Sequence, residues 1–139
     1  MPDVWVEDGS VSDGSRLWRA IPPESMYPAD PQDFSDSIFR THRLSAYIVD
    51  ETTREALVAK FPACRFREFT AKQARDLDLF IVRETDDDGD ESHVVVVRAD
   101  AQGKRISNGC ATKLKKVSKW ADVGPGQFPP APGPAAPIT

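Results

Sequence analysis

The sequence predicts an α+β domain with a small mixed or antiparallel sheet of about four to five strands and two to three short helices. Three observations support this class. Short segments rich in β-branched and aromatic residues recur along the middle of the chain, as strands require. Threonines stand just before short helical patterns, where a hydroxyl can cap the first turn. A run of four valines at residues 94–97 has the composition of a buried strand.

The first expected strand covers residues 17–21 and ends at the two prolines 22–23, because proline has no N–H to donate. A loop rich in proline, aspartate and serine follows to about residue 36. Residues 37–40 form a brief ordered element. Residues 44–49 have the β-branched and aromatic composition of a second strand.

Two short helices are expected next. Thr52 and Glu55 have the spacing of a capping box, which predicts a helix that ends near Pro62. Thr70 begins a similar pattern for a second short helix. That helical pattern gives way to an apolar run at residues 77–82, which predicts a strand.

An acidic turn at residues 85–92 separates this strand from the valine run, so an antiparallel hairpin is the simplest pairing. The valines are continuous rather than alternating with polar residues, which predicts a strand covered on both faces. Residues 101–104 form the next turn. A last helix is expected over residues 111–121, where apolar residues recur at helical spacing. These residues are Ala111, Leu114, Val117 and Ala121.

The chain has 139 residues, which fits one domain. Residues 1–15 contain many Asp, Gly and Ser and are expected to form a flexible acidic N-terminal arm. Residues 16–123 form the single α+β domain. Residues 124–139 contain prolines throughout, which predicts a disordered Pro-rich tail that joins neither helix nor sheet.

Composition limits the class of protein. The formal net charge of −4 favours solubility and argues against wholesale coating of nucleic acid. No apolar run approaches the roughly 18 residues of a membrane helix, and the acidic start lacks the basic and apolar regions of a secretory signal. We therefore expect a cytoplasmic protein with no membrane partner. Cys64 and Cys110 are expected to be free thiols, and a single disulfide is the alternative.

The acidic turn raises the question of a calcium site. An EF-hand loop needs oxygen ligands at its first, third and fifth positions, glycine at the sixth and glutamate at the twelfth. The turn matches the early positions with Glu84, Asp86, Asp88 and Gly89. The twelfth position is Val95, which cannot ligate, so we predict a solvated hairpin loop and no metal site. The chain lacks a phosphate-binding glycine loop, and we predict no cofactor.

The segment from residue 103 to residue 120 holds six basic residues and no acidic one. Its expected helix presents cations around the exposed side, because the apolar stripe faces the core. The lysines concerned are Lys113, Lys115, Lys116 and Lys119. They are candidates for binding an acidic partner protein or the phosphates of a nucleic acid. The alternative is a solvated helix face whose cations favour the negative end of the helix dipole.

Arg19, in the first expected strand, is a candidate for binding an anionic ligand such as a dinucleotide. Polar residues that follow it are candidates for the same site, namely Ser35, Ser37, Ser45 and Tyr47. His93, at the start of the valine strand, has the chemistry of an acid, a base or a donor to phosphate. The alternatives are an arginine that points to solvent, since strand side chains alternate, and a histidine whose hydrogen bonds are satisfied structurally.

Five phrases occur in a recognisable order: residues 17–23, Ser37-x-Phe39-Arg40, Leu44-Ser45, Ser92-His93-Val94-x-Val96 and Lys119-Trp120-Ala121. This order resembles a group of small uncharacterised bacterial proteins associated with defence or toxin–antitoxin-like gene clusters. The resemblance covers about residues 16–122. It implies a site at the matching positions, which are Arg19, Ser37, Phe39, Ser45 and His93.

The arginine on the first strand and the Ser-x-Phe element also resemble NAD-using ADP-ribosyltransferase or RES-type toxins. If the protein is an enzyme of this type, the candidate catalytic residues are Arg19, Ser45 and His93. The candidate ligand-binding residues are Arg19, Ser37, Phe39 and Tyr47. The later glutamate that is diagnostic of those enzymes has no assigned position in this sequence.

The leading hypothesis is a protein-interaction component of a bacterial operon without its own catalysis. It would bind a protein partner from the same operon through the hairpin edge or the basic helix. The opposite charges of the acidic turn and the basic segment support this hypothesis, as does the lack of a recognised catalytic motif. An NAD- or nucleotide-dependent enzyme is the alternative, and nucleic-acid binding through the C-terminal lysines is a further one.

Overall fold

The main sheet is built around β1 (Arg16–Ile21), which pairs antiparallel with a strand on each side. The computed structural model describes residues 7–27, 29–99 and 104–121. Within them the main sheet has six strands in the order β6-β7-β4-β1-β5-β8, all in antiparallel pairs. The other five are β4 (Leu44–Ile48), β5 (Arg65–Thr70), β6 (Leu79–Arg83), β7 (His93–Arg98) and β8 (Lys119–Trp120). The predicted α+β class is confirmed, and the sheet is larger than expected.

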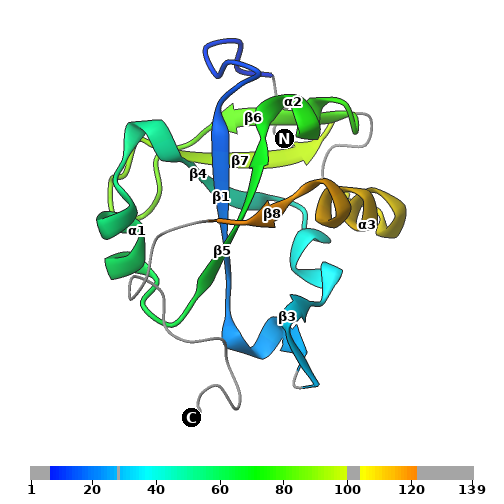
Figure 1. Cartoon of the computed structure of the whole chain (residues 1–139). Coiled ribbons are helices and arrows are strands. Elements are labelled where there is room, and N and C mark those ends of the chain that lie inside the picture. Colours follow the sequence, from blue (N-terminus) through cyan, green and yellow to red (C-terminus); the bar gives the residue numbers. More distant parts are fainter. Residues whose placement is uncertain (1–6, 28, 100–103, 122–139) are drawn as a thin grey trace.

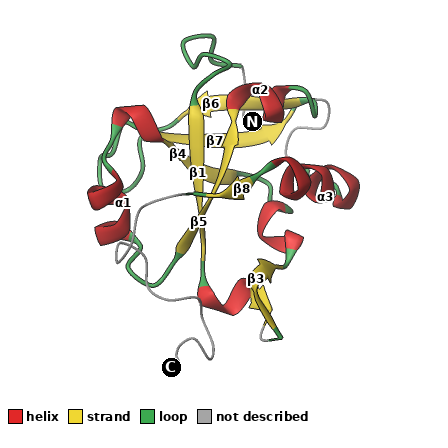
Figure 2. Cartoon of the chain, in the orientation of Figure 1, coloured by secondary structure: helices red, strands yellow, loops and turns green. Residues whose placement is uncertain are grey.

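A small second sheet, the helices and the 3₁₀ turns complete the described chain. A second, two-stranded sheet pairs β2 (Met26–Tyr27) with β3 (Asp30–Phe34) inside the segment that we expected to be a loop. The α-helices are α1 (Arg54–Lys60), α2 (Ala71–Arg75) and α3 (Asn108–Val117). Single 3₁₀ turns lie at η1 (Pro23–Ser25), η2 (Asp36–Phe39) and η3 (Val49–Glu51). Figures 1 and 2 show α1 at the left of the view and α3 at the right, with β1 and β5 between them.

Side-chain alternation along the central strands produces two hydrophobic cores, one on each face of the main sheet. Leu17 and Ile21 of β1 point into the larger core, whereas Trp18 points into the smaller one. The smaller core lies under α1, and its other buried members are Tyr47, Leu57, Phe66 and Ala121. All four valines of β7 are buried, as the continuous valine run predicts.

Each α-helix begins after a threonine or serine whose side-chain hydroxyl accepts a backbone N–H of the first turn. The capping box at Thr70 is confirmed, because its side chain accepts the Gln73 N–H and the Gln73 side chain accepts the Thr70 N–H. The box predicted at Thr52 is wrong by one residue. Thr53 is the N-cap of α1, and its hydroxyl accepts the N–H of Ala56. That register places an alanine, not a glutamate, where the reciprocal bond would form.

The last predicted helix is shifted. α3 begins after Ser107 and ends at Val117, which is 43 % exposed rather than part of the core. The chain becomes extended at Ser118, and the next two residues form β8. Arg67 stabilises this break, because its guanidinium donates to the carbonyl oxygens of Ser118 and Lys115 at the helix end.

The described part of the expected N-terminal arm, residues 7–15, packs against the domain. Val11 is 1 % exposed, and the N–H of Asp8 donates to the carbonyl of Ile81 at 2.9 Å. The N–H of Ile81 donates to the Glu7 carboxylate at 3.0 Å. These contacts occupy the outer edge of β6, which would otherwise present unpaired backbone groups. Residues 1–6, the expected turn at 101–103 and the tail at 124–139 lie outside the described residues.

The expectations about membrane helices and cysteines can also be compared with the structure. Across the described ranges, no helix combines the length and apolar character that a membrane span needs. Cys64 and Cys110 are free thiols.

Candidate functional site

Ser45, Tyr47 and His93 meet on one face of the sheet. β4 and β7 pair with Ser45 opposite Val95 and Tyr47 opposite His93, so alternation points all three polar side chains to the same side. The Ser45 hydroxyl and His93 Nε2 are hydrogen-bonded. The rings of Tyr47 and His93 meet edge to face with their centroids 5.0 Å apart. Three of the candidate residues therefore form one cluster.

The hydrogen bonds of His93 define which nitrogen carries its proton. Nδ1 lies 2.5 Å from the carbonyl oxygen of Glu84, and a carbonyl can only accept. Nδ1 therefore carries the hydrogen, and Nε2 accepts from the Ser45 hydroxyl. Burial lowers the pKa of His93 below its usual range, so the ring is neutral at pH 7.

Lys60, the last residue of α1, brings a cation to this cluster. Its ammonium lies 2.6 Å from Asp86 Oδ2, 3.3 Å from Asp90 Oδ2 and 3.5 Å from Asp88 Oδ2. It also lies 5.0 Å from the centre of the Tyr47 ring, a cation–π distance. The Lys60 side chain is only 18 % exposed. The hairpin turn between β6 and β7, residues 84–92, therefore folds around a lysine; we call it the acidic loop.

Asp86 is the centre of that arrangement. Its Oδ2 accepts the Tyr47 hydroxyl at 2.7 Å, and its Oδ1 accepts the N–H groups of Asp88 and Asp90, each at 2.9 Å. Burial would raise the pKa of Asp86, but the bonds from Lys60 and Tyr47 hold it well below the usual range. Burial likewise would lower the pKa of Lys60, and the bond to Asp86 raises it overall.

Three carboxylates of the acidic loop, those of Asp86, Asp88 and Asp90, are directed at Lys60. Across residues 7–27, 29–99 and 104–121, no three His, Cys, Asp or Glu side chains are grouped so that they could hold a metal ion. Gly89 completes the turn with a φ of 83°, a left-handed conformation that glycine adopts readily. The loop thus has acidic residues in the order found at the start of an EF-hand loop, but three of its carboxylates pair with the Lys60 ammonium.

A depression of about 430 Å³ lies over the cluster. Ser45, Tyr47 and His93 line it together with Lys60, and the acidic loop supplies its rim. Asp87 and Asp88 of the rim are exposed. The carboxylates outnumber the single lysine among the lining side chains, so the mouth of the depression is negative.

Arg19 lies beside the cluster but on the other face of the sheet. β1 and β4 pair at Leu17 and Trp18 and then diverge. The Arg19 guanidinium fills this fork and donates to the carbonyl oxygens of Ser45, at 3.2 Å, and Ile38, at 3.3 Å. Burial lowers its pKa to about 10, so it remains a cation at neutral pH. It does not line the depression.

Ser37 and Phe39 are not brought to the cluster. Ser37 is exposed on η2 and bonds with the neighbouring Ser35. Phe39 is fully buried in the larger core, where it packs edge to face against Phe34 and Phe69. Phe39 therefore has a packing role in this structure.

The four candidate lysines have different surroundings. Lys113 and Lys116 are exposed on α3. Lys115 is partly buried, where it donates to the Phe34 carbonyl at 2.7 Å and pairs with Asp33. Lys119 belongs to β8 rather than to the helix. Figure 1 places α3 on the side of the molecule opposite α1 and the acidic loop.

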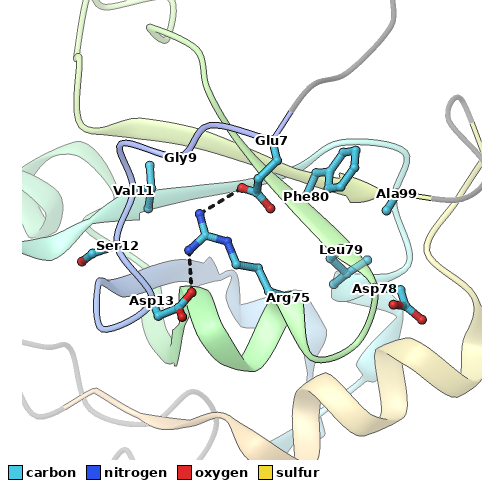
Figure 3. Close-up of a pocket in the computed structure, with 10 residues that line it drawn as sticks. All are labelled: Glu7, Gly9, Val11, Ser12, Asp13, Arg75, Asp78, Leu79, Phe80 and Ala99. Atoms are coloured by element: carbon cyan, nitrogen blue, oxygen red, sulfur yellow. Dashed lines mark hydrogen bonds and ion pairs between the residues drawn. The ribbon is translucent and has the colours of Figure 1, made fainter.

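A second depression, of about 550 Å³, lies under the N-terminal segment. Figure 3 shows Arg75 between the carboxylates of Glu7 and Asp13, at 2.9 Å and 2.8 Å. None of the candidate residues lines this depression. Its one cation is already paired twice, so its main visible role is to hold the N-terminal segment against α2.

Lys60 and Asp86 are the members of the cluster that sequence reasoning missed as site residues. Lys60 belongs to no recognisable motif, and a basic residue near the end of a helix is common because the helix dipole favours it. Asp86 was considered only as a calcium ligand. Comparison with protein-family models, with curated proteins and with solved structures finds no match to this chain.

Proposed function

We propose that this protein binds a partner protein through the acidic loop and the adjacent depression, which receive a basic segment of that partner. The observation that carries the proposal is the Lys60 ammonium, which lies among three carboxylates and over the Tyr47 ring. These groups are the surroundings that lysine and arginine side chains favour. Asp88 of this group and the neighbouring Asp87 are exposed on the rim and present that chemistry to solvent.

The acidic loop is ordered before any partner arrives, which supports the proposal. Asp86 accepts two backbone N–H groups of the loop. Asp90 accepts the N–H and the hydroxyl of Ser92 at 2.9 Å and 2.6 Å. Lys60 ties the loop to α1. A preorganised loop loses little conformational entropy on binding, so more of the interaction energy appears as affinity.

The other two surfaces considered for a partner are less available. The edge of β6 is covered at Ile81 by Glu7 and Asp8. On the basic side, Lys115 is already paired with Asp33. A partner encoded in the same bacterial operon, with an exposed basic segment, fits the acidic loop best.

The enzyme and nucleic-acid alternatives stay predictions. An NAD- or nucleotide-dependent enzyme would have to bring negatively charged phosphates to a depression whose rim is made of carboxylates. Arg19, the candidate cation for those phosphates, lies outside the depression and donates to two carbonyl oxygens. A rise in thermal stability with NAD, lost in Arg19→Lys, would favour the enzyme. Salt-sensitive binding of single-stranded nucleic acid, lost in Lys113→Glu/Lys116→Glu, would favour the third function.

Calorimetric titration with a lysine hexapeptide tests the proposal. We expect Asp87→Asn/Asp88→Asn to weaken binding about 5- to 30-fold at low salt, because each exposed ion pair contributes up to about 1 kcal/mol. Glu24→Gln removes an exposed acid from η1 and is the matched control, with an expected change below about twofold. Equal weakening by the control, or no binding of the peptide at low salt, would contradict the proposal.

A further inference from the structure

The second inference concerns the Ser45–His93 pair and is independent of partner binding. We propose that Ser45 is an activated nucleophile and His93 its general base, together forming a site that cleaves esters or other activated acyl groups. The Ser45 hydroxyl is hydrogen-bonded to His93 Nε2, and His93 Nδ1 is held by the Glu84 carbonyl. A nucleophile, a base and a group that orients the base therefore lie in sequence.

The imidazole is held in the form that a base requires. The Glu84 carbonyl fixes the hydrogen on Nδ1, which leaves the Nε2 lone pair directed at the serine hydroxyl. The edge-to-face contact with Tyr47 restrains the ring from the side. His93 is 6 % exposed, so few water molecules compete for its nitrogens. The orienting group is a backbone carbonyl in place of the more usual carboxylate.

Ser45 is reachable from solvent. It is only partly buried and lines the 430 Å³ depression. β1 has diverged from β4 at this level, and Arg19 rather than a strand takes the Ser45 carbonyl. The negative rim favours an acyl substrate that is neutral or carries a cationic group, and disfavours an anionic one.

The proposed reaction consumes only the substrate and water. Ser45 Oγ bonds to the acyl carbon while its proton passes to His93 Nε2. The bond from the acyl carbon to the leaving group breaks, and the leaving group takes that proton. Water then attacks the acyl–Ser45 ester, gives one proton to Nε2 and releases the carboxylic acid. The proton on Nε2 returns to Ser45 Oγ, so both residues end as they began.

An alkyl fluorophosphonate, a neutral serine-directed probe, tests this site in the full chain. We expect peptide mass spectrometry to locate the label on Ser45, with no label in Ser45→Ala. Labelling should be at least about 100-fold slower in His93→Gln, because general base catalysis contributes on that order. Ser12→Ala, which changes an exposed serine, should label like the wild type.

Three results would overturn the inference: no label on Ser45 in the folded wild type, an unchanged labelling rate in His93→Gln, or equal labelling of Ser12. Should His93→Gln fail to fold, nitrogen NMR of the wild-type imidazole decides. A neutral ring protonated on Nδ1 at pH 7 is expected, and protonation on Nε2 instead would overturn the inference. Neither readout depends on the lysine peptide, so the two proposals can fail separately.

Discussion

The ammonium of Lys60 lies 2.6 Å from a carboxylate oxygen of Asp86, and this contact joins the last turn of α1 to the acidic loop. The same oxygen accepts the Tyr47 hydroxyl from β4. Helix, loop and sheet therefore meet at one carboxylate. Both proposals use this arrangement, because it orders the acidic rim and places the loop over Ser45 and His93.

Removing the lysine should destabilise the protein clearly. Lys60→Met leaves the carboxylates of Asp86 and Asp90 without their cation, so we expect a loss of about 2 kcal/mol in the free energy of unfolding. Lys72→Met is the control, since Lys72 pairs with Asp76 at an exposed helix position and should contribute about 0.3–0.5 kcal/mol. Urea unfolding measures both, and equal losses would argue against a structural role for Lys60.

Stability should fall in two stages as the pH is lowered. The pKa of His93 is lowered in the folded state, so the unfolded chain binds its proton more tightly and stability declines once the pH drops below roughly 6.5. The pKa of Asp86 is also lowered, so a further decline begins below about pH 4. Urea unfolding across the pH range should show the first stage disappear in His93→Gln while the second remains. Persistence of the first stage in that variant would assign it to another group.

The two neighbouring threonines should differ in their effect on α1. Thr53→Ala removes the hydroxyl that accepts the Ala56 N–H, and we expect it to lower the free energy of unfolding by about 1 kcal/mol. Thr52→Ala leaves that cap in place and should have less than half the effect. Thermal unfolding of the pair checks the assignment, and a larger effect at Thr52 would restore the capping register that the sequence predicts.

Arg19 should stabilise the folded protein. Arg19→Met preserves side-chain length but leaves the Ser45 and Ile38 carbonyls without their donor in the fork between β1 and β4, so we expect a loss of about 2 kcal/mol. Arg16→Met, which breaks an exposed pair with Asp50, should lose less than about 1 kcal/mol. Urea unfolding measures both variants. If Arg19→Met is as stable as the wild type, the structural role assigned to Arg19 between β1 and β4 is wrong.

The fold class and several elements were predictable because their signals are local. Thr70 caps a helix through bonds to a residue three positions away, and β7 is a continuous run of valines. β5 was missed because three of its six residues are charged and its two phenylalanines, Phe66 and Phe69, lie three positions apart on opposite faces of the sheet. Pairing with β1 and β8 makes this segment a strand. The end of α3 was missed because Arg67, distant in sequence, stabilises it.

The site was predictable only in part, because it depends on contacts between residues that are distant in sequence. Ser45, Tyr47 and His93 were recognised as chemically capable residues, but their meeting depends on the register of β4 against β7. Arg19 was expected beside them, and strand alternation directs it to the opposite face. Lys60 belongs to no recognisable motif, and its ion pair with Asp86 forms only when the acidic loop folds over it.

Amide NMR shifts during titration with the lysine hexapeptide test the central claim most directly. The acidic loop is the proposed binding surface, so the largest shifts should fall within residues 84–92 and at Lys60. They should fade as salt approaches roughly 0.15 M and above, because exposed charges are screened. Shifts centred instead on the second depression near Arg75, or spread evenly over acidic residues, would contradict the account.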